Sequence, residues 1–436
     1  STNLNDTHTI QGSIGDIVLQ DNDGIYRPED IDMDVILRPD TTHAIVSCGD
    51  FYLNMDASGS YEDLLSAIGN VSDEVIRQMD ERYIDQPMLR ERLPLASIKL
   101  NSGSENVVAR MLKRYSIGCG SLAMDMTSSP TSGLNGYMRA NAMTVSDILV
   151  DTASLVIFSD SSNVSYRMQV HNNKDNPDYI FNAIVEGTLT EKGTTIKSRL
   201  YDWKDRLGLA TDMSAAMEDN GVKVTFIGDG PVLGYKKFAV NKDNYLFLSE
   251  DKRVSANLKL RASDGTGLQV YTNDENADAL QDITLSVNKL DLDDIFAILP
   301  FTPNMTGILD GDFHAIQTPD ELTVSSSLTV SNMIYEGCKM GDVGTEFTYM
   351  PLSNGSHSVD GIMIHNGQEI GTLSGTYASE GDGFLDATLS LAHTPLSLVN
   401  GFIPDQLFGL NGYCEGDLSV KGPLSQPQVN GELYLD

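Results

Sequence analysis

The segment Glu321–Asn332, ELTVSSSLTVSN, shows most clearly which fold this chain adopts. Its apolar residues recur at every second position or a multiple of two, which is the period of a β-strand and not of a helix. Hydroxyl-bearing residues occupy the positions between them. We therefore predict a strand with one apolar face, formed by Leu322, Val324, Leu328 and Val330, and one hydrophilic face.

The same alternation recurs in segments before and after this one: RVSANLKLRA (253–262), DITLSVNKL (282–290) and FLDATLSLAH (384–393). Strands buried on both faces, as in parallel sheets, usually read as unbroken apolar runs, so this alternation favours antiparallel pairing. Turn-forming stretches such as SDGTG (263–267), LDGD (309–312) and HNGQE (365–369) suggest a meander of hairpins. The expected fold class is mainly all-β, with an elongated antiparallel sheet and two or three short helices.

Helical periodicity interrupts the strands in a few places. Ser60–Tyr83 begins with a capping serine followed by acidic residues and carries apolar residues at helical spacing, and Glu105–Tyr115 is a shorter candidate. A third candidate, LDDIFAILP, runs from Leu292 to Pro300. We expect a β-rich segment at 1–59, a helical insertion at 60–115 and a sheet with a groove at 116–291.

An internal repeat divides the remainder of the chain. LDDIFAILPFTPNMTGILDGDFHA (292–315) resembles LSLVNGFIPDQLFGLNGYCEGDLSV (396–420), with an offset of 104 residues that becomes 105 after one insertion. The repeat predicts a unit at 292–395, a short helix followed by a meander, and the start of the next unit at 396–436. A repeat of this size indicates stacked units.

Composition narrows the possible partners. The chain has 436 residues, with 29 Lys and Arg against 62 Asp and Glu, a formal net charge of −33 that makes a nucleic-acid partner improbable. Its four cysteines are too far apart for a zinc site and are expected to be small apolar residues without a bridge. We predict no metal and no cofactor. The sequence contains neither a signal peptide nor an apolar run long enough to span a membrane.

Known catalytic signatures are also missing: the sequence has no GxSxG, HExxH, P-loop or strand-linked GxGxxG motif. The expectation is that the chain is not an enzyme. The spacing alone leaves three alternatives open. The apolar faces could cover each other in a closed sandwich that serves a structural or adhesive role, or they could line an open groove. A β-rich enzyme acting on polysaccharides, with paired carboxylates among the 62 acids, is the third.

The closing stretch GPLSQPQVNGELYLD (422–436) places glycine, proline and aliphatic residues at fixed positions. This pattern resembles the recurrent phrase of the TamB family, AsmA-like proteins that are the inner-membrane component of the translocation and assembly module. LNGYCEGDLSV (410–420), MTGILDGDFHAI (305–316) and the segment 236–272 resemble strands of the same family. The resemblance covers Val222–Asp436.

The resemblance implies a long sheet curled into an open apolar groove, in a periplasmic protein whose full length is anchored to the inner membrane. It implies transport of phospholipid between the inner and outer membranes, assembly of outer-membrane proteins, or both, with an outer-membrane β-barrel protein of the Omp85 type as partner. This chain would be an internal periplasmic piece. Phospholipid acyl chains would contact Val254, Leu258, Leu260, Ile283, Leu285, Val287, Leu322, Val324, Leu328, Val330, Leu385, Leu389, Leu391, Leu418, Val420, Leu433 and Leu435.

Overall fold

In a computed structural model of the chain, the described residues are 7–21, 24–145, 148–160, 163–173, 180–273, 279–298, 303–379, 383–402 and 409–436. The chain divides into a first unit, Ser1–Asp219, and a second unit, Asn220–Asp436. This boundary falls inside the segment 116–291, which the sequence analysis treated as one piece. The all-β prediction is confirmed, because both units consist mainly of antiparallel strands.

The first unit contains three helices and fourteen strands among its described residues. The helices are α1 (Tyr61–Asp80), α2 (Gln86–Glu91) and α3 (Val107–Lys113). The strands are β1 (His8–Ile14), β2 (Leu19–Asp21), β3 (Gly24–Tyr26), β4 (Ile31–Leu37), β5 (Thr41–Cys48), β6 (Phe51–Ser58), β7 (Ala96–Ser102), β8 (Ile117–Ser129), β9 (Gly133–Val145), β10 (Ile148–Ser159), β11 (Val164–Asn172), β12 (Phe181–Thr190), β13 (Gly193–Tyr201) and β14 (Leu207–Glu218).

The second unit contains α4 (Leu292–Phe296) and the 3-10 helix η2 (Leu396–Phe402). Its strands are β15 (Gly221–Phe226), β16 (Val232–Leu233), β17 (Lys236–Val240), β18 (Tyr245–Ser249), β19 (Val254–Ala262), β20 (Gly267–Thr272), β21 (Gln281–Asp291), β22 (Met305–Gln317), β23 (Leu322–Tyr335), β24 (Cys338–Pro351), β25 (Ser356–His365), β26 (Gln368–Ala378), β27 (Phe384–Pro395), β28 (Tyr413–Pro423) and β29 (Gln428–Leu435).

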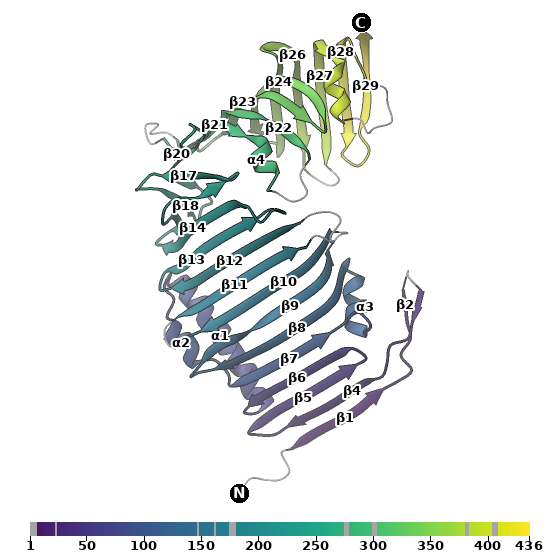
Figure 1. Ribbon diagram of the computed structural model, residues 1–436, viewed down its shortest axis with the longest axis vertical. Helices are drawn as coiled ribbons and strands as arrows, with labels where there is room; N and C mark the ends of the chain where they lie inside the picture. Colours follow the sequence, from purple (N-terminus) through teal and green to yellow (C-terminus); the bar gives the residue numbers. More distant parts are fainter. Residues whose placement is uncertain are drawn as a thin grey trace. The chain divides into compact units, whose positions relative to one another are not determined.

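Successive strands pair antiparallel in both units. In the first unit β1 pairs with β4, each strand from β4 to β14 pairs with the next, and β2 and β3 form a separate hairpin. In the second unit the same order holds from β18 to β29, while β15 pairs with β18 and β17 with β19. The first-unit sheet is curved, and α1 and α2 lie behind it (Figure 1). The described strands therefore form a meander and not a sandwich of two separate sheets.

Local sequence explains where the hairpins turn. Asn366 and Gly367 have φ of 51° and 78° and separate the paired residues His365 and Gln368. Two consecutive residues with positive φ form the type I′ turn that matches strand twist, and Asn-Gly is its preferred sequence. The turn predicted at 263–267 is also formed. The turn predicted at LDGD is wrong, because these residues lie inside β22.

The two copies of the internal repeat are preceded by the same backbone irregularity, a residue with left-handed φ at a β-bulge. The strand before each short helix carries one non-glycine residue with left-handed φ: Lys289 in β21 and His393 in β27, both at 52° and 104 positions apart. Each lies where the pairing register shifts, which marks a β-bulge. The strands that follow, β22 and β28, also correspond. Pro300 and Pro404, which the sequence comparison aligned, lie outside the described residues.

The helical insertion predicted at 60–115 is only partly helical, because it also contains the strand β7. Apolar and polar residues do alternate in β7, ASIKLNS, but this run is only seven residues long and lies between two helical patterns. The helix predicted at 292–300 ends earlier, since α4 ends at Phe296. All four cysteines are free, as expected, and Cys48 and Cys414 are buried.

Candidate functional site

The strand registers bring all seventeen predicted lining residues onto one face of the second-unit sheet. Residues directly opposite each other in an antiparallel pair point to the same side, so a row of such pairs defines a face. One row crosses from β19 to β29 through Leu258, Val270, Leu285, Phe313, Ser326, Phe347, Gly361, Leu373, Leu389, Leu418 and Gly431. We call this side the second apolar face.

The opposite side of the same strands is hydrophilic. The adjacent row contains Lys259, Gln269, Ser286, Asp312, Ser327, Glu346, Ile362, Thr372, Ser390, Asp417 and Glu432. Ile362 is the one aliphatic residue in it. A sheet with this asymmetry has one face suited to water and one suited to apolar contacts.

The second apolar face is closed at one end by the chain itself. Phe238 is 1% exposed and forms a core cluster with Leu258, Leu260 and Ala262. Phe226, Leu233 and Leu246 pack against this cluster. Of the predicted lining residues, Leu258 and Leu260 therefore have little surface left for a ligand.

Most of the other predicted residues are partly accessible. Val287 is buried, with an exposed fraction of 9%. The exposed fractions of Leu433 and Leu435 are 40% and 68%, and the remaining residues are half-buried. Among the described residues no second sheet covers this face. Within this unit α4 contacts β22, and η2 contacts β24.

A comparable face in the first unit was missed by the sequence analysis. Its central row, from β4 to β14, consists of Met33, Val46, Leu53, Leu100, Met124, Met138, Leu155, Met168, Val185, Ser198 and Thr211. We call this side the first apolar face. The signal was present in SLAMDMTSS (121–129), where methionine takes the place of the leucine and valine seen later in the chain. Methionine is flexible and fills irregular apolar surfaces.

Helix α1 adds further exposed apolar surface to the first unit. It is held at its start by Ser60, whose side chain accepts a hydrogen bond from the Asp63 amide at 3.1 Å. Leu64 is buried, as are Glu74 and Gln78 further along the helix. Adjacent to this buried side lies an exposed stripe formed by Tyr61, Leu65, Ile68, Val75, Ile76 and Met79.

The ion pairs around Glu74 fix α1 to the segment that follows it. The Glu74 carboxylate accepts hydrogen bonds from Arg77 and Gln78 and pairs with Arg92 at 2.9 Å, while its side chain is only 1% exposed. The hydrogen bonds from Arg77 and Gln78, together with the charges of Arg77 and Arg92, lower the pKa of Glu74 to about 2 despite desolvation. This cluster is structural, since the Glu74 carboxylate is fully engaged by its partners and Arg77 also pairs with Glu81 at 2.6 Å.

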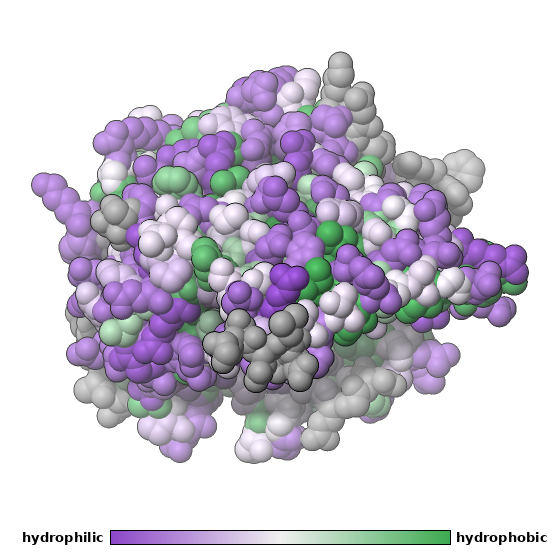
Figure 2. Space-filling view, turned by 90° about the horizontal axis from the view of Figure 1, so that it is seen from below, coloured by the Kyte–Doolittle hydropathy of each residue, from purple (hydrophilic) through white to green (hydrophobic). Residues whose placement is uncertain are grey.

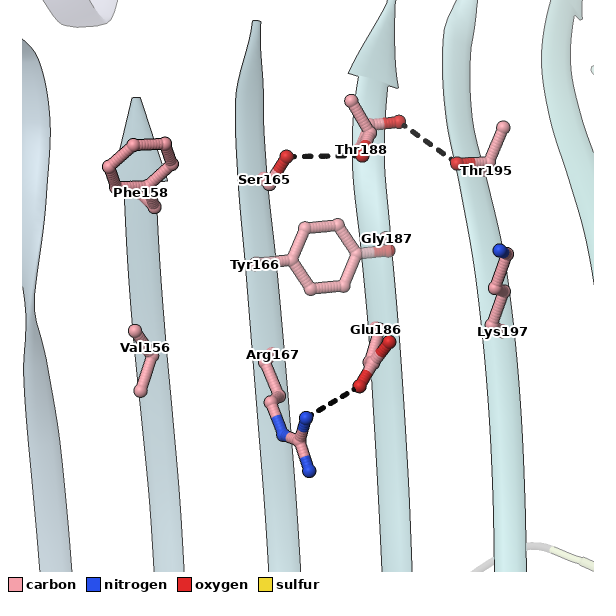
Figure 3. A pocket seen from close by; sticks show the side chains of 10 residues that line it. All are labelled: Val156, Phe158, Ser165, Tyr166, Arg167, Glu186, Gly187, Thr188, Thr195 and Lys197. Carbon is pink, nitrogen blue, oxygen red and sulfur yellow. Dashed lines mark hydrogen bonds and ion pairs between the residues drawn. The ribbon is translucent and has the colours of Figure 1, made fainter. Parts of the chain in front are cut away.

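The side of the first-unit sheet opposite the first apolar face carries a shallow recess over β10 to β13 (Figure 3). Arg167 and Glu186 form an ion pair there at 2.8 Å, and the side-chain oxygens of Ser165 and Thr188 are hydrogen-bonded at 3.1 Å. These side chains are bonded to each other across neighbouring strands. The hydroxyl groups of Ser165 and Thr188 are hydrogen-bonded to each other, and the one carboxylate among the ten lining residues, Glu186, is paired with Arg167.

Figure 2 shows the surface from one direction only. Seen from below, hydrophilic residues cover most of the surface, and hydrophobic residues appear in smaller patches between them (Figure 2).

In the described part of the chain no group of three or more His, Cys, Asp or Glu side chains is placed to hold a metal ion. None of the described helices is both long and apolar enough to cross a membrane.

No protein-family model, curated protein or solved structure matches this chain. The two apolar faces are therefore the features of this chain that bear most directly on its function.

Proposed function

We propose that this chain binds lipid acyl chains along its apolar faces and acts as a carrier without catalysis. The observation that carries the proposal is the alignment of apolar residues from β19 to β29 on one side, opposite a hydrophilic side. Most of these residues keep accessible surface. Acyl chains are recognised by apolar contact alone, so a site for them needs no catalytic group.

Transfer of an acyl chain from water to an apolar face is energetically favourable. Each buried methylene gains about 0.8 kcal/mol, so a chain of about sixteen carbons that enters water loses on the order of 12 kcal/mol. A continuous apolar face would remove most of this cost at every position along the sheet. Strands lie about 4.8 Å apart, so the ten intervals from β19 to β29 extend over about 48 Å. Movement would then be sliding along the face and not escape into water.

The cellular setting is proposed from the resemblance to the TamB family. We place the protein in the periplasm, as part of an inner-membrane-anchored protein that carries phospholipid between the inner and outer membranes, aids assembly of outer-membrane proteins, or does both. An outer-membrane β-barrel protein of the Omp85 type is the proposed partner. The net charge of −33 agrees with a hydrophilic outer surface that resists self-association.

The test uses two adjacent residues of β27 that point to opposite faces. Leu389 lies on the second apolar face and Ser390 on the hydrophilic side. We expect Leu389→Arg to reduce labelling of the purified protein by a photoactivatable fatty acid several-fold, because a charge in an apolar contact is costly. Ser390→Arg is the matched control and should leave labelling unchanged.

A second pair in β23, Val324→Arg and Ser327→Arg, repeats the comparison elsewhere on the face. Lipid in an organic extract of the purified protein gives an independent readout by mass spectrometry. Equal labelling of all four variants and the parent, together with an extract free of lipid, would reject the proposal. That result would favour a structural or adhesive β-array.

A further inference from the structure

Helix α3 ends in an exposed cluster that the apolar faces do not include. Val108, Met111 and Tyr115 lie three and four residues apart, so they share one side of the helix and its C-terminal turn. Their exposed fractions are 41%, 56% and 78%. We define the α3 patch as these three residues with the basic residues Arg110, Lys113 and Arg114.

The charge of the α3 patch is opposite to that of the chain. No Asp or Glu occurs from Asn106 to Met124, although the chain carries 62 acidic residues and a net charge of −33. Lys113 and Arg114 are exposed. Two acidic residues lie at the start of the helix. Glu105 directly precedes Asn106, and Asp50 accepts hydrogen bonds from the Asn106 side chain at 2.6 Å and from the Glu105 amide at 3.0 Å.

The patch is held in place from beneath. Asn106 is fully buried and caps the helix by accepting a hydrogen bond from the Ala109 amide at 2.8 Å. Arg110 lies over the ring of Tyr26 at 5.6 Å, which ties the helix to the hairpin β2–β3. In Figure 1, α3 lies at the opposite ends of the first-unit strands from α1 and α2. The exposed residues therefore project from a fixed base near one end of the first-unit strands.

We propose that the α3 patch docks the protein on the surface of a bilayer containing anionic phospholipids. Basic residues near such a surface are attracted to it, while tyrosine and aliphatic side chains insert at the level of the head groups. At about 0.1 M salt the Debye length is about 10 Å, so distant acidic residues repel the membrane only weakly. This proposal stands on the α3 patch and does not require acyl chains on the apolar faces.

The test is co-sedimentation of the purified chain with vesicles at about 0.1 M salt. Phosphatidylcholine vesicles with phosphatidylglycerol should bind the protein, and vesicles of phosphatidylcholine alone should bind it far less. Lys113→Gln/Arg114→Gln should weaken binding to the anionic vesicles by about tenfold or more, because each basic residue contributes about a fivefold factor. Met111→Ser/Tyr115→Ser should also weaken it.

The control is Lys197→Gln/Lys259→Gln, which removes two exposed charges from the hydrophilic faces and changes the net charge by the same amount. It should bind as the parent does. Fatty-acid labelling of each variant, measured in parallel, separates this proposal from the carrier function. The membrane proposal is overturned if the parent ignores anionic vesicles, or if the α3 variants and the control bind equally.

Discussion

Gly187 in β12 shows how closely the strands approach on the first apolar face. It lies opposite Tyr166 of β11, and an added Cβ would be 2.4 Å from the hydroxyl oxygen of that tyrosine. The same Cβ would be 2.3 Å from the carbonyl oxygen of Thr195, a backbone atom that cannot rotate away. The tyrosine ring thus occupies the space that a side chain on β12 would need. Gly311, whose φ is 150°, provides similar room for Leu328 in the second unit.

We expect Gly187→Ala to destabilise the first unit by about 1–3 kcal/mol, because the new methyl group must displace the strand beside it. Urea unfolding measures the effect. Gly12→Ala is the matched control, since an added Cβ there has no heavy atom within 4 Å and Gly12 is also in a strand. The control should change the free energy of unfolding by about 0.5 kcal/mol or less. Equal stabilities of the two variants would contradict the steric argument.

Glu74 makes the stability of the first unit depend on pH. Its pKa in the folded protein is about 2, against an ordinary value of 4.5, so the folded state favours the charged carboxylate. A lowered pKa stabilises the protein above the unfolded value and loses this contribution as the pH falls toward the folded value. The window in which the contribution fades is therefore about pH 4.5 to 2.

Glu74→Gln removes this titration while keeping the size of the side chain. The parent should resist urea better than Glu74→Gln at neutral pH, and the gap between their midpoints should narrow as the pH falls from about 4.5 toward 2. Other carboxylates titrate in both proteins, so the difference isolates Glu74. If the difference between the two urea midpoints stays constant over this range, the contacts of Arg77 and Arg92 do not depend on the charge of Glu74.

At the scale of elements, α1 begins where its sequence signals it should. Ser60 and Asp63 form a reciprocal capping box: the Asp63 amide donates to the Ser60 hydroxyl, and the Ser60 amide donates to the Asp63 carboxylate at 3.0 Å. These bonds satisfy two backbone amides that the helix leaves without partners. The predicted start of this helix is correct because the capping box depends only on residues close together in the sequence.

Ser60→Ala should destabilise α1 by about 1 kcal/mol, because the side-chain half of the cap is lost. Hydrogen exchange of the amides in the first turn measures this directly. Ser66→Ala, an exposed change inside the same helix, should be neutral or stabilising by up to about 0.5 kcal/mol, since alanine is the better helix former. Faster exchange in both variants would contradict the assignment of the effect to the cap.

At the scale of the whole molecule, both units present an apolar face made by consecutive strands. If lipid moves along both faces, each should be required for transfer but should bind acyl chains independently. Met168 is 43% exposed on the first apolar face, and Gln169 is its neighbour on the hydrophilic side. These two residues provide a matched pair in the first unit.

We expect Met168→Arg or Leu389→Arg to stop protein-dependent transfer of fluorescent phospholipid between vesicles, because a charge on an apolar face interrupts the path of the acyl chain. In each variant, fatty-acid labelling should persist in the unmodified unit, as mapped by mass spectrometry of peptides. Gln169→Arg should transfer lipid as the parent does. Undiminished transfer by Met168→Arg would exclude the first apolar face from the path.

Sequence reasoning recovered the features that are local. The alternation in β23 and β27, the Asn-Gly turn at 366–367 and the capped start of α1 each depend on residues a few positions apart. The turn expected at LDGD failed because Gly311 serves a close approach between strands, which a local pattern cannot distinguish from a hairpin. The first apolar face was not predicted for a different reason, since its strands carry methionine where the other strands carry leucine, valine and isoleucine.

By itself the sequence determined that this protein is a meander of two-faced antiparallel strands, because side-chain alternation is a property of each strand alone. Only the tertiary structure decided that, within each unit, the registers align the apolar residues of successive strands in a row on one side of the sheet, since register joins strands across the sheet. The tertiary structure also decided that Phe238 packs against Leu258 and Leu260 and buries them, while Leu433 stays exposed. Covering a side chain depends on which distant segments fold against it, and no local pattern contains that information.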